Sequence, residues 1–545
     1  MAFANGSDFL LSESVEIKND TFNFQPRIDD NFHNWISCFC IVTFDLELGQ
    51  VIEKVFPEKY CLTEIERTNI CYLAFPDSNT GCMGDTSFHF RIRSKAKYKI
   101  NVLNQDMQYQ TGYVLFRQVK DESIKRGYFQ KSVVLLTRLP YIELFLKLTK
   151  LIATAYFDTG DVAMETVCNQ ISNWPTQSLG KVIQLPVLGD VIELSTFEDY
   201  KSNIKSLSYL YYYYQPRLYQ CFYSIVSCIQ MLWELVLLGE PIVVIAPTPM
   251  LCSEGVQTLV SMIHPLHYVC DYRPYFTIHD SEFKEYTTKN QFFPNVILGV
   301  TNPYFVKTFQ NWPNLIRLGE MSSLTATKID KKTVDFIPGI YTKYKACLSK
   351  DKALVRKIER AIKANQSVET LNGFLCKYVI ELTQSFLIPL ERYIGSLMPL
   401  QRSILPWKSP PKLKKFNIDE FVATLPIYGP HLTSKLKGNW TLLYQKFFKS
   451  PNFEVWFCKR RQEVNNKLEI LHLEALCNAD VNSWTKGKDE VEIVDLYMYV
   501  KKTLLYCKTG NVYVSPSIRH DLHSQLLMVL KALPSDLQEV LKKSL

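Results

Sequence analysis

The sequence lacks any paired-cysteine motif. It holds 15 cysteines in 545 residues, an odd number, and no CxxC occurs among them. Several lie singly inside apolar runs, among them Cys71, Cys221 and Cys228. Disulfide frameworks and cysteine-rich metal sites need grouped or evenly paired cysteines. The pattern therefore predicts reduced, buried thiols in a cytoplasmic protein.

Long apolar runs are also scarce. The most apolar stretch, Met231 to Leu251, is interrupted by two glutamates, a glycine and three prolines. A membrane-spanning helix needs roughly 20 largely unbroken apolar residues. The first residues of the chain have neither the basic start nor the apolar centre of a signal peptide. We therefore expect no transmembrane segment and at most a peripheral association with membranes.

Basic charge is not concentrated along most of the chain. The net charge is +8, and lysine and arginine are scattered apart from a modest excess between Lys328 and Lys363. Nucleic-acid-binding proteins usually gather their basic residues on one face, so we expect no nucleic-acid partner. The excess has two interpretations, a solvated linker with a helix face or a contact with an anionic membrane.

The common catalytic motifs are missing too. The sequence has no GxxxxGKS/T phosphate loop, no GxGxxG after a strand, no GxSxG elbow and no HExxH helix. His264 and His267 form an HxxH pair, but Pro265 lies between them and the sequence offers no third ligand. We expect no cofactor, no metal site and no covalent catalysis.

The tyrosine-rich run from Tyr209 to Tyr214 is the most unusual local feature. Aromatic side chains supply contact area in cores and at protein interfaces, and they also form stacking platforms for bases. No basic residues are interleaved with this run. It therefore favours a core or a domain interface over a partner surface, and a partner surface over nucleic acid.

The periodicity of the sequence predicts a multi-domain α/β protein. Residues 1–34 are polar and aperiodic, which is typical of a flexible lead-in, and residues 35–157 predict an α+β domain with a five-stranded antiparallel sheet. Thr63 and Glu66 form a capping box for its first helix. The predicted strands are Trp35–Asp45, Gln50–Phe56, Ser87–Arg93, Gly112–Val119 and Gly127–Leu136, and the predicted helices are Leu62–Leu73 and Tyr141–Tyr156.

Two further regions follow a linker. Residues 158–200 read as that linker, with two short runs that suit edge strands. In residues 201–342 helices alternate with short apolar strands, which predicts a mostly parallel sheet covered on both faces. Residues 343–545 predict a mostly helical region. The clearest predicted elements are a long helix at Leu218–Leu238, strands at Pro241–Ala246, His267–Asp271 and Val296–Val300, and helices at Glu254–Ile263, Cys376–Leu400, Phe453–Cys477 and Val491–Tyr506.

Several long segments resemble DENN-domain proteins. The FPDS motif at Phe75 to Ser78 is one, and the resemblance extends from about Trp35 to the C-terminus, weakest in the last forty or so residues. The others are GEPIVVIAPTPMLCSE (Gly239 to Glu254), CDYRPYFTIHD (Cys270 to Asp280), PNVILGVTNPYF (Pro294 to Phe305), LTQSFLIPLERYIGSLMPLQ (Leu382 to Gln401), KSPNFEVWF (Lys449 to Phe457) and LEILHLEAL (Leu468 to Leu476). The tail segments are similar to one branch, DENN-domain-containing family six.

The resemblance implies a fold and a function. The first domain would be an upstream DENN domain of the longin type, the second a central DENN domain, and the last a helical downstream DENN region. The implied activity is guanine-nucleotide exchange on a Rab GTPase, met in its GDP-bound or nucleotide-free state. The branch is associated with the endosomal Rab numbered fourteen, and the resemblance places the protein in the cytoplasm, recruited to recycling endosomes.

The resemblance also singles out four residues for contact with the Rab. They are Phe75 and Asp77 of the first domain with Asp280 and Asn302 of the second, which stand in family motifs at the ends of elements, where partner-binding residues tend to lie. Read from the residues alone, Asp77 suits a turn and Asn302 suits a helix cap.

Other classes of function stay open at this point. An adaptor would bind a loaded Rab without exchanging its nucleotide. A DENN-type activator of GTP hydrolysis would use an arginine, for which Arg91, Arg93, Arg273 and Arg317 are candidates. An enzyme with a pocket that the sequence does not reveal is a more distant alternative.

Overall fold

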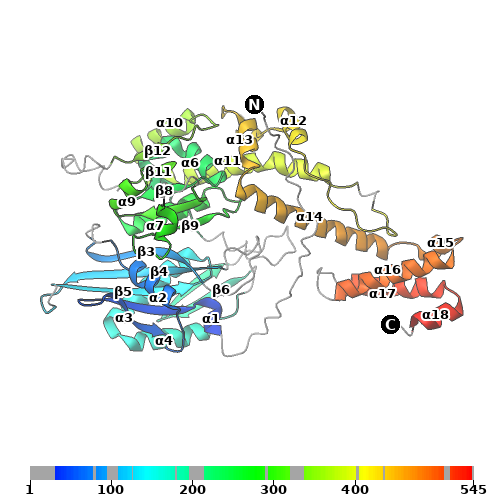
Figure 1. Ribbon diagram of the computed structural model, residues 1–545, viewed down its shortest axis with the longest axis horizontal. Coiled ribbons are helices and arrows are strands. Elements are labelled where there is room, and N and C mark those ends of the chain that lie inside the picture. The colour runs from blue at the N-terminus through cyan, green and yellow to red at the C-terminus, as the bar shows by residue number, and fades with distance from the viewer. Residues whose placement is uncertain are drawn as a thin grey trace. The chain divides into compact units, whose positions relative to one another are not determined.

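The computed structural model describes residues 31–77, 82–94, 108–124, 127–177, 181–195, 214–288, 293–319, 337–400, 404–433, 436–508 and 516–542. The described chain divides into two compact units. The larger unit comprises Ile28–Leu397 and Lys414–Glu463, and the smaller one includes Met398–Leu413 and Val464–Leu545. Within the larger unit we distinguish an N-terminal lobe, residues 31–195, from a central lobe, residues 214–397 and 414–463 (Figure 1).

The N-terminal lobe is built on an antiparallel sheet in the order β2-β1-β5-β4-β3. Its strands are β1 Cys38–Asp45, β2 Gly49–Phe56, β3 Gly84–Arg93, β4 Tyr109–Lys120 and β5 Tyr128–Thr137. The five predicted strands are therefore confirmed. On β4 a side chain at Gly112 would place its Cβ 2.3 Å from the Phe90 ring, so the bare backbone there lets β3 and β4 pack closely.

Helices cover this sheet and complete its core. They are α1 Asn31–Trp35, α2 Glu64–Leu73, α3 Ile142–Thr159 and α4 Asp161–Ser172. The predicted capping box is present, because the Thr63 side chain accepts a hydrogen bond from the Glu66 N–H and the Glu66 carboxylate accepts one from the Thr63 N–H. Phe145 and Leu148 of α3 are fully buried in the lobe's core.

The described residues of the predicted linker, 158–177 and 181–195, form regular elements. Met164, Val167 and Ile171 of α4, which was not predicted, are buried in the core of the N-terminal lobe, and Trp174 packs edge-on against Trp35 with ring centroids 5.4 Å apart. The two predicted edge strands form a hairpin, β6 Val182–Val187 with β7 Asp190–Ser195. The described part of this segment therefore belongs to the lobe.

The central lobe contains the predicted parallel sheet. Its order is β12-β11-β8-β10-β9, and only β12, at one edge, runs antiparallel. The strands are β8 Ile242–Ile245, β9 Asp271–Arg273, β10 Val296–Val300, β11 Asn314–Arg317 and β12 Gly339–Thr342. Every residue of β8 and β10 is buried, as expected for strands covered on both faces.

The predicted helix at Leu218–Leu238 is broken. The chain forms α5 Leu218–Phe222, then a 3₁₀ segment η4 Tyr223–Cys228 in which Ile225 departs from helical geometry, then α6 Ile229–Leu237. By length and composition Leu218–Leu237 could span a membrane, but 67% of it is buried inside the lobe, so it is a core segment. It is the one such candidate among the described residues.

Further helices complete the central lobe. They are α7 Pro249–Ser261, α8 Phe283–Thr287, α9 Tyr304–Thr308, α10 Lys352–Lys363, α11 Val368–Leu397, α12 Ile418–Tyr428, the 3₁₀ turn η8 His431–Thr433, and α13 Trp440–Phe447. Helix α11 continues through Pro389 as a single element, although a proline inside a helix removes one backbone hydrogen bond. Helix α14, Pro451–Cys477, belongs to the central lobe as far as Glu463.

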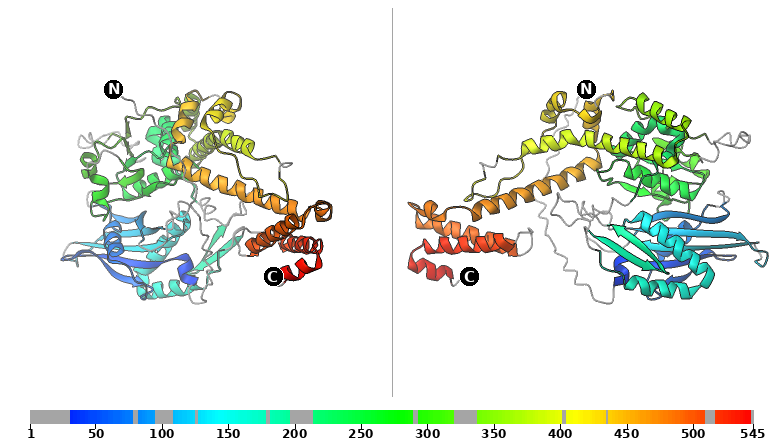
Figure 2. Two further views of the ribbon diagram at one scale, coloured as in Figure 1. Left: turned by 45° about the vertical axis from the view of Figure 1, so that its right-hand side comes forward. Right: turned by 180° about the vertical axis from the view of Figure 1, so that it is seen from behind.

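The smaller unit is helical in its described part. Its helices after α14 are α15 Val481–Thr485, α16 Glu490–Lys508, α17 Pro516–Lys531 and α18 Ser535–Lys542, and Figure 2 shows α16 and α17 lying side by side. Tyr497 of α16 and Leu522 of α17 are fully buried in its core. The predicted helical C-terminal region is thus confirmed.

Candidate functional site at the junction of the two lobes

The FPD segment follows α2 and lies at the junction between the N-terminal and central lobes. The ring of Phe75 is buried and packs edge-on against Phe116, 5.2 Å between centroids, so it faces the core of its own lobe. The Phe75 carbonyl accepts a 3.3 Å hydrogen bond from the Tyr275 hydroxyl of the central lobe. Phe75 therefore positions the turn through its ring and reaches the other lobe through its backbone.

Asp77 spans the junction with its side chain. Its carboxylate accepts a 2.7 Å hydrogen bond from the Thr301 hydroxyl, and its own N–H donates to the Tyr275 hydroxyl at 2.9 Å. Burial raises the pKa of Asp77, and the neighbouring central-lobe side chains oppose that rise, namely Thr301, His279, Asn302 and Tyr275. An acid placed in this way links two segments more than 200 residues apart in sequence.

Asn302 stands beside Asp77 at the end of β10. Its amide oxygen accepts a 2.9 Å hydrogen bond from the N–H of Tyr304, the first residue of α9. Pro303 lies between them at the cap position and forms no side-chain cap hydrogen bond, so the helix begins one residue later than the sequence predicted. Asn302 itself is half-buried, whereas Tyr304 is 55% exposed. The structure thus brings Asp77 and Asn302 together at a partly exposed edge.

Asp280 lies in the loop after β9 and is buried. Its carboxylate accepts a 2.9 Å hydrogen bond from the Glu282 N–H, and burial raises its pKa. The residues on either side of it contact α2: His279 stacks on Tyr72 at 4.6 Å, and Ser281 exchanges two hydrogen bonds with Asn69. Asp280 therefore shapes the loop that carries these contacts across the junction.

A cluster of charges forms a second part of the junction. Arg273 of β9 is buried between Asp271 and Glu282 and donates a 3.1 Å hydrogen bond to the carbonyl of Arg91 in the N-terminal lobe. Arg91 is buried too, 3.5 Å from Asp271 and stacked between the rings of Tyr109 and Tyr272.

Each of the four arginines considered for an activator of hydrolysis has a contact within this chain. Arg93 contacts Glu282 at 3.3 Å, and Arg317 lies over the ring of Tyr341. Buried arginines held by carboxylates cannot reach into a partner's active site without breaking those pairs. In this arrangement Arg91 and Arg273 hold the lobes together.

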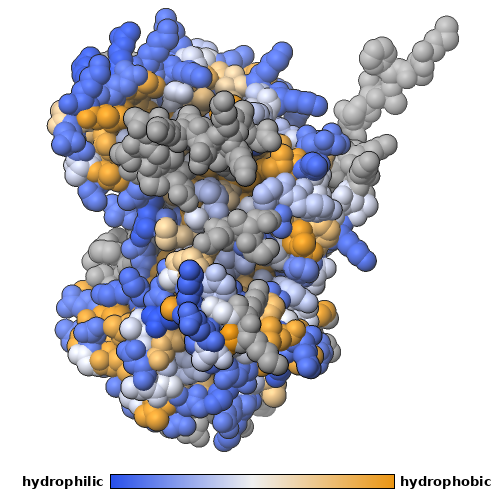
Figure 3. Space-filling model, turned by 90° about the vertical axis from the view of Figure 1, so that its left-hand side faces the viewer, coloured by the Kyte–Doolittle hydropathy of each residue, from blue (hydrophilic) through white to orange (hydrophobic). Residues whose placement is uncertain are grey.

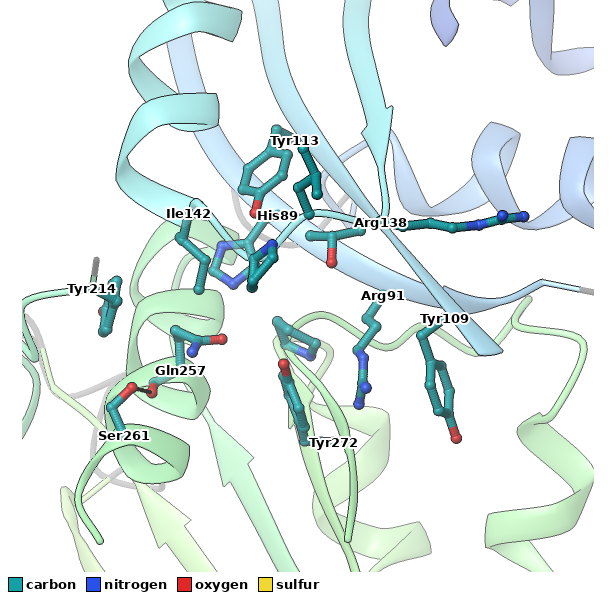
Figure 4. Close-up of a pocket in the computed structure, with 14 residues that line it drawn as sticks. His89, Arg91, Tyr109, Tyr113, Arg138, Ile142, Tyr214, Gln257, Ser261 and Tyr272 are labelled. Carbon is teal, nitrogen blue, oxygen red and sulfur yellow. Dashed lines mark hydrogen bonds between the residues drawn. The ribbon is translucent and has the colours of Figure 1, made fainter. Parts of the chain in front are cut away.

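A small cavity lies beside this cluster. It has a volume of about 50 Å³, and Figure 4 shows His89 and Tyr113 of the N-terminal lobe facing Gln257 of α7. His89 is buried, and burial lowers its pKa to about 4, a shift that the neighbouring Gln257 side chain opposes. A polar cavity of this size holds a water or two, so it suits hydration of the junction better than a substrate.

The structure also describes part of the tyrosine run and the His264–His267 pair. Tyr214, the last residue of the tyrosine run, packs at α7 with its hydroxyl 3.1 Å from that of Thr258, and Tyr209–Tyr213 lie outside the described residues. Burial lowers the pKa of His264, next to His267. Within the described ranges no three His, Cys, Asp or Glu side chains gather as metal ligands.

The sequence matches known protein families and relatives. A family profile described as "Transport protein Avl9" matches residues 36–182, and one described as "DENND6 C-terminal domain" matches residues 481–544. Protein DENND6A of Gallus gallus is 46% identical over 550 residues, which cover 94% of each chain. Protein DENND6B of Homo sapiens is 44% identical over 545 residues, covering 94% of this chain and 93% of the relative.

The chain belongs to the DENND6 family. The resemblance seen in the sequence is therefore confirmed, and the DENND6 profile covers even the last forty residues, where that resemblance was weakest. The more distant Protein DENND6 homolog of Dictyostelium discoideum is 33% identical, over 86% of this chain and 77% of its own length. The Avl9 profile includes α4, in agreement with the packing of that helix on the N-terminal lobe.

Sequence reasoning missed the partners of the FPD segment in this DENND6 protein. Tyr275 and Thr301 each lie within a resembling motif, but only the fold shows that they meet Asp77. The available signal was weak: Thr301 is a hydrogen-bonding residue directly after the apolar strand β10, whereas Tyr275 lies two residues after β9, which is mostly polar. Tyrosine and threonine side chains at such places are common, so the pairing is not visible in one sequence.

The Asp77–Thr301 contact can be measured by a double-mutant cycle. Asp77→Ala, Thr301→Val and the double variant are expected to give a coupling free energy of about 1–3 kcal/mol, since hydrogen bonds to charged groups fall in that range. Urea unfolding gives the three values. A coupling near zero would show that the hydroxyl does not bind the carboxylate in solution.

Proposed function

We propose that this DENND6 protein is a guanine-nucleotide exchange factor for a Rab GTPase. Membership of the DENND6 family supports a DENN-type role on Rab proteins. We further propose that the partner is the endosomal Rab numbered fourteen, that the N-terminal lobe is a longin domain and the central lobe a DENN domain, and that the protein acts from the cytoplasm at recycling endosomes.

The mechanism needs no covalent step. An exchange factor binds the empty GTPase more tightly than the loaded one, so by linkage the nucleotide binds the complex more weakly by the same factor. The protein draws the switch segments away from the magnesium ion and phosphates that they hold. Contact surface and a few inserted groups do this work, which agrees with a sequence that has no catalytic motif.

The observation that carries the proposal is the construction of the lobe junction. Two lobes with different folds are held by the Asp77–Thr301 bond and by the buried Arg273 cluster. A partner that binds across both lobes therefore meets two surfaces already fixed in relative orientation. Such preorganisation reduces the ordering that association would otherwise require.

The four predicted contact residues keep distinct roles in this proposal. Phe75, Asp77 and Asp280 act as positioning residues that set the junction, because their side chains are wholly or partly buried there. Asn302 is the one we assign to the Rab surface, since it is half-buried next to the exposed Tyr304.

Release of fluorescent GDP from a panel of purified Rab proteins tests the function. With the full chain added, one Rab is expected to lose GDP at least about tenfold faster, a barrier lower by roughly 1.4 kcal/mol. A small GTPase outside the Rab family is the control. Binding without faster release would make the protein an adaptor, and faster phosphate release would make it an activator of hydrolysis; both outcomes contradict exchange.

The same assay separates contact from architecture at Asn302. Asn302→Ala should lower the exchange rate while the unfolding midpoint stays the same if the side chain touches the Rab. A lower midpoint with unchanged activity per folded molecule would give Asn302 a purely structural role, through its hydrogen bond to the Tyr304 N–H at the start of α9.

A further inference from the structure

Helix α10 carries a straight row of cations on its outer face. Lys352, Arg356, Arg360 and Lys363 recur at intervals of three or four residues, so they form one stripe along the helix. Leu354, Ile358 and Ala361 on the opposite face are buried against the lobe. Asp351 is the N-cap of the helix, and its carboxylate accepts hydrogen bonds from the N–H groups of Ala353 and Leu354.

The stripe shares its face of α10 with one acidic side chain, the exposed Glu359. Within the described residues none of its four cations forms an ion pair, whereas Arg117, Arg217 and Arg460 each contact a carboxylate within 3 Å. Like charges four residues apart on a helix repel each other, which destabilises the helix. The four exposed cations therefore lower the stability of α10 slightly and leave a strong positive field facing solvent.

The surroundings of the stripe strengthen that field. Between Lys343 and Lys363 there are eight basic and two acidic residues, a local net charge of +6 within a chain whose total is +8. Lys343, Lys345 and Lys350 are exposed, and so is the apolar side chain of Ile362 on α10, at 50%. Basic side chains beside an exposed aliphatic one are compatible with contact at a membrane interface.

We propose that α10 and the lysines before it dock the protein on an anionic membrane surface. In Figure 1 the helix lies at the upper edge of the central lobe, and Figure 3 shows hydrophilic side chains protruding at that height with apolar ones between them. A convex row of cations fits a plane of lipid phosphates, and each lysine or arginine near an anionic leaflet adds attraction. The exposed Ile362 of α10 suits the boundary between headgroups and acyl chains.

Nucleic acid is the main competing partner for a basic surface, and the geometry disfavours it. The stripe itself contains no aromatic residue on which a base could stack. Lys357, next to the stripe, lies 4.0 Å from the ring of Phe374, so that ring is already occupied. Membrane docking also agrees with an intact helix that already buries its apolar face, because the lipid then needs only the outer side.

Vesicle binding of the full chain tests this proposal without any GTPase, so it stands or falls independently of the exchange activity. The protein is expected to sediment with vesicles of phosphatidylcholine containing 30 mol% phosphatidylserine and not with pure phosphatidylcholine. Raising the salt concentration to 0.5 M should release it, because the Debye length shortens. The variant Arg356→Glu with Arg360→Glu should bind at least tenfold more weakly.

The matched control reverses two exposed lysines on another helix, Lys147→Glu with Lys150→Glu on α3. It has the same net charge as the test variant and is expected to bind the anionic vesicles like the unaltered chain. Circular dichroism confirms that both variants fold. Equal loss in both variants, equal binding to neutral vesicles, or tighter binding to a single-stranded oligonucleotide that Arg356→Glu with Arg360→Glu abolishes would each overturn the proposal.

Discussion

Replacing Arg273 with methionine is expected to lower the free energy of unfolding by about 3–5 kcal/mol, the range found when one partner of a buried ion pair is removed. The Arg273 side chain is only 2% exposed, and the carboxylates beside it, Asp271 and Glu282, are 13% and 16% exposed. Without the guanidinium these two carboxylates would face each other in a poorly hydrated junction. The carbonyl of Arg91 would also lose its donor.

The matched control for this result is Arg93→Met. Arg93 contacts the same carboxylates, with Asp271 at 3.8 Å and Glu282 at 3.3 Å, but its side chain is 44% exposed. Exposed ion pairs contribute between 0 and about 1 kcal/mol, so its loss should be small. Urea unfolding followed by tryptophan fluorescence gives both values. Equal losses for the two variants would contradict the view that burial makes Arg273 the central residue of the cluster.

The contrast between these two arginines shows what a single sequence can reveal. Both were candidates for a catalytic arginine, because sequence gives the residue type and its neighbours but not its burial. Arg273 is the last residue of strand β9. The carboxylate of Asp271, two residues earlier in the same strand, lies 3.1 Å from the Arg273 guanidinium. The second carboxylate, Glu282, comes from a loop whose path depends on the tertiary structure.

The secondary structure was more predictable than the site. Strands β1, β4 and β5 carry apolar, β-branched and aromatic runs that predicted them within a few residues. Helix α4 was missed because Gly160 and Pro175 at its ends suggested a loop, although Gly160 only separates it from α3. The break at Ile225 was missed because apolar residues continue through it, and periodicity cannot distinguish a buried 3₁₀ turn from a buried helix.

The junction explains why motif residues need not be contact residues. Phe75 and Asp77 stand in the FPDS motif, and within this chain Phe75 packs against Phe116 and Asp77 bonds to Thr301. A motif required to align two lobes affects the partner surface indirectly. Exchange and stability therefore have to be measured together on every junction variant, because only their ratio separates alignment from contact.

Acidification is expected to weaken the larger unit through His89. The unfolded chain binds a proton at this residue near its ordinary pKa of about 6.5, whereas the folded chain, with the pKa of His89 lowered to about 4, does not. Unfolding is therefore favoured progressively as pH falls from 6.5 to 4, and the stability present above pH 6.5 drops by about 3 kcal/mol, at 1.36 kcal/mol per pKa unit. Below pH 4 both states carry the proton and the loss levels off.

The variant His89→Phe isolates this contribution. The charged groups that face His89 across the cavity are Arg91 and Arg138, and no aspartate or glutamate is among the described residues that line it. Phenylalanine keeps the ring beside Tyr113, 5.9 Å away in the unaltered chain, and removes the proton site. Urea unfolding between pH 7 and 4 should then show a smaller fall in the free energy of unfolding with pH, with a slope that corresponds to up to one proton fewer taken up on unfolding. His33→Phe, which removes an exposed histidine of the same lobe, should leave the loss unchanged. Parallel curves for His89→Phe and the unaltered chain would mean that His89 is already protonated, or hydrated, in the folded protein.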